Sequence, residues 1–189
     1  MATFYPSITD EQADLIRNAP LFFVASVEPA LGHGPDGQGP VNVSPKGGVP
    51  LHILDKNRVA FLDYVGSGNE TARHSSLGGP ITVMIGSYDA ENAAIVRLYG
   101  HATVTPLDES PIADLLLGSQ ADDIALPQRQ AIEITIDQTV TSCGYGVPVM
   151  DFVKDRTTSE RGRKYKDGTP PTGQNLLSSS CQPTSKITG

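Results

Sequence analysis

The spacing of apolar residues along the chain predicts short strands separated by turns. Apolar, strand-like segments recur at residues 21–28, 41–46, 51–54, 59–65, 81–87 and 95–105. Clusters of Gly, Pro, Asn and Asp separate these segments, as is typical of antiparallel β structure. The clearest strand covers residues 131–137, where three isoleucines alternate with polar residues, since such alternation indicates one buried face. The pattern therefore predicts about seven strands.

Three short helices are predicted between the strands. Residues 7–18 form the first, because Thr9 can cap it and Gln12 stands at the capping-box position. The second covers residues 69–78, and the third covers residues 110–118, which start with Ser-Pro and end on Gly. We therefore predict a mainly β (α+β) fold, in which a small β-barrel carries short helices on its outside.

Composition supports one domain followed by a polar tail. A chain of 189 residues is in the size range of a single domain, and its 19 glycines and 15 prolines agree with a turn-rich fold. Residues 174–189 are mostly Ser, Thr, Pro, Gln and Lys, a composition too polar to build a packed core. We expect residues 1–173 to form the folded domain and residues 174–189 to be a mobile tail.

The charge balance and the cysteines exclude several classes of function. The 14 basic residues against 21 acidic ones give a net charge of −7, whereas nucleic acids and anionic membranes are bound by basic surfaces, so we expect neither partner. The two cysteines and four histidines show no zinc-site spacing, and we expect no metal. The first residues lack a signal-peptide pattern, and no apolar run is long enough to span a membrane, which predicts a cytoplasmic protein.

Residues 59–79 combine a strand, a Gly-Ser-Gly turn and the start of a helix. Free backbone N–H groups at such a junction can bind a phosphate, and Ser67, Asn69 and Thr71 add side-chain donors. The same residues also suit an ordinary N-capped helix on the surface. The local sequence leaves both interpretations open.

Two other segments place polar side chains on strands. Asn42, Ser44 and Lys46 fall on one face of a strand by the two-residue period, where they can line a polar ligand or face solvent. Arg97 lies within a strongly β-prone segment, and a buried arginine is usually paired with a phosphate or with a carboxylate such as that of Asp63. The alternative places Arg97 on an edge strand facing water.

Cys143 and Tyr145 lie in the glycine-rich segment 142–148. A nucleophilic cysteine needs a neighbouring base or cation, and the sequence near Cys143 supplies neither. We therefore interpret Cys143 and Tyr145 as pocket-lining residues, and the sequence assigns no catalytic residue.

Several of these segments, in this order and spacing, resemble the pyridoxamine 5′-phosphate oxidase-like family. The matching segments are Asn-Val-Ser-Pro-Lys-Gly at 42–47, Asn-Arg-Val-Ala-Phe-Leu-Asp at 57–63, Gly-Ser-Gly-Asn-Glu-Thr-Ala-Arg-His at 66–74, Val-Arg-Leu-Tyr-Gly at 96–100 and Ser-Cys-Gly-Tyr-Gly-Val-Pro at 142–148. The resemblance covers roughly residues 20–152, and it is to the flavin-binding split-barrel proteins rather than to the true oxidase. It implies a split β-barrel homodimer with FMN bound at the subunit interface.

The resemblance also implies which residues hold the cofactor. The strand at 41–46 is expected to lie along the flavin, and the turn and helix at 67–73 are expected to take its phosphate. The strand that carries Arg97 is expected to lie nearby. The cofactor-binding residues implied in this way are Asn42, Ser44, Lys46, Ser67, Asn69, Thr71 and Arg97.

Departures from the true oxidase change the expected reaction. Gly-Asn-Glu stands where the oxidase carries basic residues, and the oxidase's C-terminal Trp…Arg motif is absent because the chain has no tryptophan. The resemblance therefore implies an FMN-dependent oxidoreductase acting on an unidentified small molecule. The alternative is a non-catalytic protein of the same fold that binds or stores FMN, haem or a tetrapyrrole. A haem would need an axial histidine, for which His74 and His101 are the nearest candidates.

Overall fold

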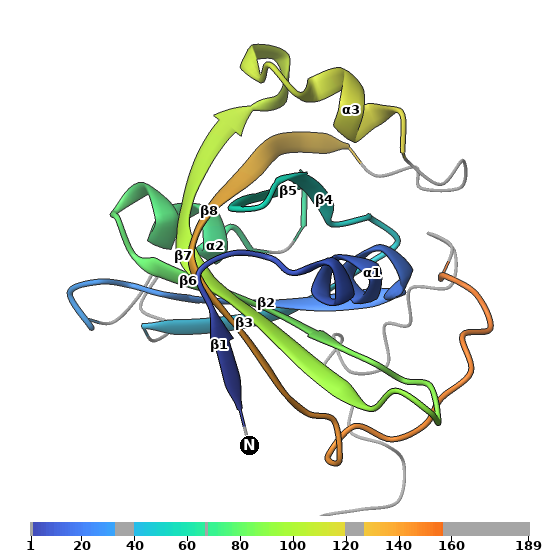
Figure 1. Cartoon of the computed structure of the whole chain (residues 1–189). Helices are drawn as coiled ribbons and strands as arrows, with labels where there is room; N and C mark the ends of the chain where they lie inside the picture. Colours follow the sequence, from blue (N-terminus) through green and yellow to red (C-terminus); the bar gives the residue numbers. More distant parts are fainter. Residues whose placement is uncertain (1, 33–39, 67, 120–126, 157–189) are drawn as a thin grey trace, which may run out of the picture. The chain divides into compact units, whose positions relative to one another are not determined.

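Eight strands form one antiparallel sheet in the computed structural model, which describes residues 2–32, 40–66, 68–119 and 127–156 (Figure 1). The strands are β1 (Thr3–Tyr5), β2 (Leu21–Val27), β3 (Val41–Gly47), β4 (His52–Asp55), β5 (Arg58–Tyr64), β6 (Pro80–Gly86), β7 (Ala94–Pro106) and β8 (Gln128–Cys143). Their order across the sheet is β3-β2-β6-β7-β8-β5-β4, and β1 pairs with the end of β8. β3 and β4 therefore stand at the two ends of this order, each paired on one side among the described residues.

The predicted strands are confirmed, and their ends shift by one residue except in the last strand. β8 extends well beyond the predicted 131–137, because it pairs with β5 at its beginning, with β7 along its length and with β1 at its end. The register of β7 against β8 shifts between Tyr99 and Gly100. A side chain at position 100 would overlap the backbone of Thr135, so this bulge requires glycine.

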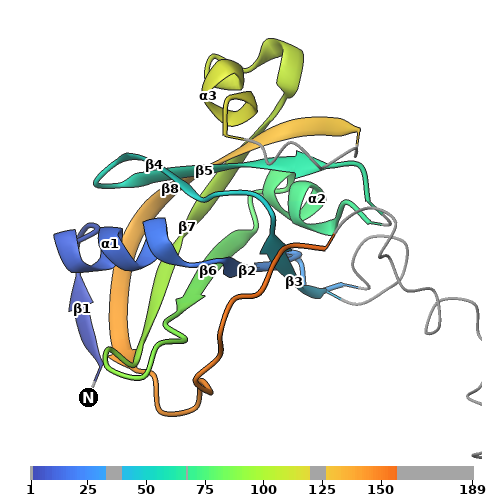
Figure 2. The ribbon, with the colours of Figure 1, turned by 90° about the vertical axis from the view of Figure 1, so that its right-hand side faces the viewer.

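The three predicted helices are present and lie against the sheet. They are α1 (Asp10–Asn18), α2 (Glu70–Ser76) and α3 (Ala113–Leu117), and a 3-10 turn, η2 (Leu107–Glu109), precedes α3. The capping box of α1 is confirmed: the Thr9 hydroxyl accepts from the backbone N–H of Gln12, and the Gln12 side chain accepts from that of Thr9. Figure 2 shows α2 between the end of β5 and β3, a position that matters for the site.

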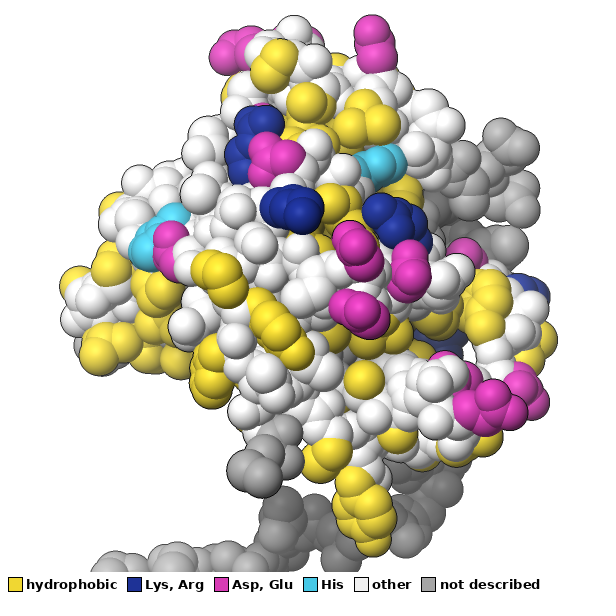
Figure 3. Space-filling view, in the orientation of Figure 1, with side chains coloured by type: hydrophobic (Ala, Val, Ile, Leu, Met, Phe, Trp, Pro, Cys, Tyr) yellow, Lys and Arg dark blue, Asp and Glu magenta, His cyan; other side chains and the backbone are white. Residues whose placement is uncertain are grey.

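The surface seen in Figure 3 carries both signs of charge side by side. Basic and acidic side chains are interspersed on this face, and no continuous basic area is visible among the described residues. No helix in the described ranges is long and apolar enough to cross a membrane.

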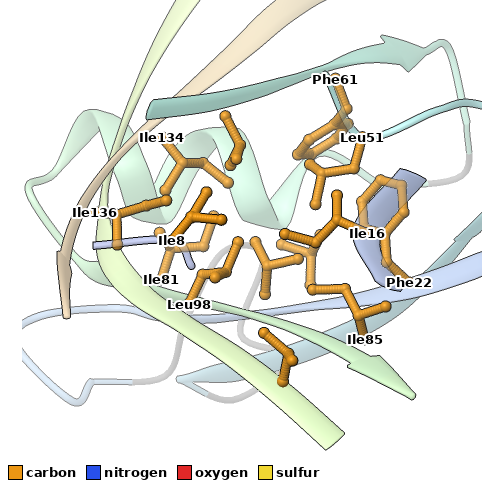
Figure 4. Close-up of a cluster of buried hydrophobic side chains, with 14 of the residues drawn as sticks. Ile8, Ile16, Phe22, Leu51, Phe61, Ile81, Ile85, Leu98, Ile134 and Ile136 are labelled. Atoms are coloured by element: carbon orange, nitrogen blue, oxygen red, sulfur yellow. The ribbon is translucent and has the colours of Figure 1, made fainter. Parts of the chain in front are cut away.

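The main core lies between α1 and the inner face of the curved sheet (Figure 4). Ile16 of α1 packs among fully buried side chains from the strands, including Phe61, Ile85 and Leu98. The Phe22 and Phe61 rings meet edge to face with their centroids 5.5 Å apart. A smaller cluster joins Leu116 of α3 to the other face of β5 and β8. All of these residues belong to one unit, Met1–Ser159, and the predicted tail 174–189 lies outside the described residues.

Candidate functional site

A cavity of about 390 Å³ opens between two strands and the start of α2. Its size is within the range of small-molecule sites, which is about 300–1,000 Å³. The lining comes from β3, the end of β5, the turn that leads into α2, the first residues of α2 and the start of β8: Asn42, Ser44, Lys46, Asp63, Tyr64, Gly66, Gly68, Asn69, Glu70, Thr71 and Arg129. Five of the seven residues predicted to bind a cofactor are in this set.

The alternation along β3 places its polar side chains in the cavity. Asn42, Ser44 and Lys46 are half-buried, whereas Val41 and Val43 lie on the opposite face and are exposed. This arrangement confirms the predicted shared face. Asn42 also donates a hydrogen bond to the Thr71 hydroxyl at 3.3 Å, which joins β3 directly to α2. Two segments singled out separately in the sequence thus form one wall.

An ionic cluster centred on Asp63 forms the floor of the cavity. The Asp63 carboxylate is buried and lies 3.2 Å from Lys46 Nζ and 3.3 Å from an Arg129 guanidinium nitrogen. Gln130 donates a hydrogen bond to it at 2.8 Å. Asp63 therefore holds two cations at fixed positions along the cavity, while its negative charge offsets their mutual repulsion.

Arg129 is the main site residue that sequence reasoning missed. Its guanidinium also donates to the carbonyl oxygens of Tyr64 at 2.6 Å and Gly68 at 3.2 Å, so it ties β8 to the turn before α2. Its side chain is only 23% exposed. The one sequence signal was a cation just ahead of the alternating segment 131–137, and nothing local connects that position to Asp63.

Three residues that line this cavity each carry a buried polar atom for which no hydrogen-bond partner is found among the described residues. These atoms are Ser44 Oγ, Tyr64 OH and Arg129 Nε. A buried polar group without a partner costs about 1–3 kcal/mol, so three of them in one place are typical of a site that a ligand completes. Burial raises the pKa of the Tyr64 hydroxyl, which keeps it protonated and able to donate at neutral pH.

Asn69 does not cap α2. It occupies the N-cap position, but its side chain makes no hydrogen bond to the helix and instead accepts from the Gln130 amide at 2.9 Å. The interpretation of this segment as an ordinary N-capped surface helix is therefore wrong. Asn69 and Thr71 both line the cavity, and the phosphate-site interpretation stays a prediction.

The remaining candidates are not brought to this cavity. Ser67 lies outside the described residues. Arg97 is half-buried on β7 and donates to the Ser142 hydroxyl at 3.0 Å. The suggested pairing of Arg97 with Asp63 is wrong, because Lys46 and Arg129 are the cations bound to that carboxylate. Cys143 is an exposed free thiol and Tyr145 is 95% exposed, and neither is among the described residues that line the cavity.

The histidines considered as haem ligands also lie elsewhere. His74 is fully buried within α2, and its Nδ1 is 2.9 Å from the Ser26 hydroxyl. His101 lies 3.1 Å from Asp137, and both side chains are largely exposed. Among the described residues, no histidine lines the cavity and no cluster of residues is suited to hold a metal ion.

Comparisons with known proteins agree with the fold. No family model matches the sequence. The chain is 34% identical over 163 residues to the pyridoxamine 5′-phosphate oxidase family protein ustO of Aspergillus flavus, a match that covers 85% of this chain and 61% of that relative's length. The chain thus spans less than two thirds of this relative.

Two solved structures share the architecture at low sequence identity. One, from Lactobacillus delbrueckii, bears the name of pyridoxamine 5′-phosphate oxidase; it is 19% identical, with a TM-score of 0.52 over 71% of this chain and 94% of that one. The other is an FMN-binding protein from Syntrophomonas wolfei, 10% identical, with a TM-score of 0.50 over 75% of this chain and 90% of that one. They show a common fold, the split β-barrel. The chain is thus similar in sequence to a pyridoxamine 5′-phosphate oxidase family protein and shares the split-barrel fold of these structures.

Proposed function

We propose that this chain is a flavoprotein that binds FMN, with the phosphate end of the cofactor in the cavity between β3, β5 and α2. One observation carries the proposal: Ser44 Oγ, Tyr64 OH and Arg129 Nε are buried, with no partner in the described part of the chain, on residues that line a cavity also lined by Lys46. Hydroxyl, guanidinium and ammonium groups are the donors that phosphates require. The FMN-binding protein from Syntrophomonas wolfei, which shares the fold, supports this choice of ligand.

The fixed donors of the cavity, rather than its net charge, explain how an acidic protein can bind an anion. The chain carries a net charge of −7, and a phosphate monoester adds about −1.5 to −2. Binding must therefore rest on local donors rather than on the overall field. Lys46 and Arg129 are already positioned by Asp63, so little side-chain entropy is lost when they bind a phosphate.

The chain's own residues would bind and orient the cofactor. Lys46 and Arg129 would donate charge-assisted hydrogen bonds to the phosphate, and Ser44, Tyr64 and Thr71 would supply hydroxyls along the cavity. When bound, FMN supplies the transfer of electrons or hydride, and the protein contributes position and electrostatics. We propose oxidoreductase activity towards a small molecule on this basis, and no side chain of the cavity is assigned a catalytic role.

We further propose that the protein is a homodimer. The edge strand β3 exposes Val41 and Val43, and the segment after β8 exposes Tyr145, Phe152 and Val153. Exposed apolar side chains on an edge strand and on a neighbouring irregular segment are typical of a surface that another chain covers. A second copy would protect this edge and would enclose the cofactor between the subunits.

Haem is disfavoured relative to a flavin. The His74 ring is fully buried beside Ser26, and the His101 ring lies beside Asp137. Neither ring reaches the cavity. Flavin storage without turnover is the alternative within the same site, and it differs from the oxidoreductase only in whether a bound flavin is reduced and reoxidised.

The experiment is native mass spectrometry of the purified protein together with its absorption spectrum. We expect two subunits and two FMN molecules, identified after release by chromatography, and reduction of the bound flavin by NADPH or another small donor. A colourless protein that takes up no FMN on reconstitution would contradict the flavoprotein proposal. A loaded protein of a single 20.0 kDa chain would contradict the homodimer.

A further inference from the structure

The cavity contains two carboxylates in opposite situations. Asp63 is buried, accepts hydrogen bonds from Lys46 and Gln130, and forms an ion pair with Arg129. Glu70, the first residue of α2, is half-buried on the cavity lining, and no hydrogen bond or ion pair is found for it among the described residues. A partly buried glutamate normally has a partner, so the partner of Glu70 is expected to come from a ligand.

Glu70 folds back over the turn that forms the cavity's rim. Its carboxylate lies against Gly68, and any side chain at position 68 would overlap it. The two cations of the cavity do not compensate it, because both are bound to Asp63. Glu70 is therefore a hydrogen-bond acceptor that is available to whatever occupies the cavity.

This acceptor changes what the cavity can recognise. Lys46 and Arg129 together are balanced by Asp63 and Glu70, so the cavity has no formal excess of positive charge. An anion without hydroxyl groups accepts hydrogen bonds from Lys46 and Arg129 but is repelled by the Glu70 carboxylate. An anion attached to a hydroxyl-bearing chain gains the same donors and also supplies hydrogen bonds to Glu70. The two kinds of ligand differ in this one contact.

We propose that Glu70 determines specificity: it accepts hydrogen bonds from ligand hydroxyls and repels anions that bring none, so the cavity selects a phosphate attached to a polyol. This inference rests on the proposed function, because FMN carries a ribityl chain next to its phosphate. It makes Glu70 a ligand contact, which goes beyond the phosphate-binding role proposed for Lys46 and Arg129.

The competing explanation is that Glu70 only stabilises α2. An acidic residue in the first turn interacts favourably with the helix N-terminus. Glu11 is a matched control, since it stands in the first turn of α1 and is not among the residues lining the cavity. A purely helix-stabilising role predicts that Glu70→Gln and Glu11→Gln both lower the melting temperature slightly and leave ligand selectivity unchanged.

The test is calorimetric titration of the full chain, freed of cofactor, with ribitol 5-phosphate and with inorganic phosphate. We expect the wild type and Glu11→Gln to bind ribitol 5-phosphate more tightly than inorganic phosphate. In Glu70→Gln the ratio of these two affinities should fall about tenfold, because a neutral amide replaces the charged acceptor and no longer repels inorganic phosphate. An unchanged ratio of the two affinities in Glu70→Gln would overturn the inference.

The outcome for Glu70 is separable from that of the proposed function. Neither probe contains a flavin ring, so the selectivity ratio is measured whether or not the protein binds FMN. A parallel FMN titration of the wild type tests the proposed function. Absence of FMN binding together with a changed ratio would overturn the flavoprotein proposal and support the role of Glu70.

Discussion

Two buried polar clusters of this protein differ in whether the chain satisfies them. In the first, which joins α1 to β8, Gln12 is buried and uses both ends of its amide: Oε1 accepts from the Thr9 backbone and from the Thr139 hydroxyl, and Nε2 donates to the Thr141 hydroxyl. In the second, whose residues line the cavity, three buried polar atoms have no partner within the described ranges.

The difference separates a structural cluster from a binding cluster. Burial of polar groups is costly unless they are hydrogen-bonded, and the α1–β8 cluster avoids this cost within the chain. The cavity does not avoid it, so part of the stability of the free protein is lost there. Substitutions in the first cluster should affect folding alone, and substitutions in the second should affect binding, together with folding where the residue also has partners within the chain, as Arg129 does.

Substitution of Arg129 should have the largest effect, because this residue serves both folding and binding. Arg129→Met leaves the buried Asp63 with one cation fewer and removes two hydrogen bonds to backbone carbonyls. We expect a loss of about 3 kcal/mol of stability and loss of detectable FMN binding. Thermal unfolding and an FMN titration measure both. Arg58→Met is the control, since the Arg58–Asp55 pair is exposed to solvent, where an ion pair contributes little to stability. Equal losses in both variants would refute the role of Arg129.

Gln12→Ala should lower stability alone. It removes three hydrogen bonds of the α1–β8 cluster, each of which contributes roughly 1 kcal/mol, so we expect a loss of about 2–3 kcal/mol. For a chain of this size the melting temperature should fall by about 4–12 °C. The FMN affinity of the folded variant, measured well below that temperature, should match the wild type. A parallel fall in affinity would show that the two clusters are not independent.

Tyr64→Phe should have the opposite pattern. No described residue is a hydrogen-bond partner of this hydroxyl, so its removal should leave the melting temperature unchanged or raise it. If the hydroxyl donates a hydrogen bond to bound FMN, its removal should weaken the affinity for FMN by about fivefold to tenfold, which corresponds to a hydrogen bond of roughly 1 kcal/mol. Differential scanning calorimetry of the free protein and a fluorescence titration measure the two effects. A destabilised variant with normal FMN affinity would assign Tyr64 to folding.

Arg97→Ala should have the smallest effect. Arg97 is hydrogen-bonded to Ser142 and does not line the cavity, so we expect a loss of at most about 1 kcal/mol of stability and no change in FMN affinity. Affinities for FMN and riboflavin should be compared. A weaker affinity for FMN with an unchanged affinity for riboflavin would mean that Arg97 does contact the phosphate, as the family resemblance implies, with the contact made across the dimer.

The sequence predicted those features that depend on neighbouring residues. The strands, the α1 capping box and the shared face of Asn42, Ser44 and Lys46 follow from local period and spacing, and the structure confirms them. The prediction for β8 is too short. The alternation of buried and exposed residues along β8 is interrupted opposite the bulge at Gly100 of β7, and beyond that point the strand continues because it pairs with its neighbours.

The centre of the site could not be predicted in the same way. Asp63 and Arg129 meet because β5 and β8 pair side by side, and neither residue stands in a motif that indicates the other. Asp63 was considered only as a partner for Arg97. Long-range strand pairing decides which charges meet, and one sequence contains no local signal of that pairing.

The most direct test of the central claim is a titration of cofactor-free Lys46→Ala and wild type with FMN and with riboflavin, which lacks the phosphate. If the cavity holds the phosphate, Lys46→Ala should weaken the affinity for FMN by about tenfold to a hundredfold, which is the effect of one charge-assisted hydrogen bond. The affinity for riboflavin should change much less. If Lys46→Ala binds both ligands as tightly as the wild type, the phosphate is bound elsewhere and the account of this cavity is wrong.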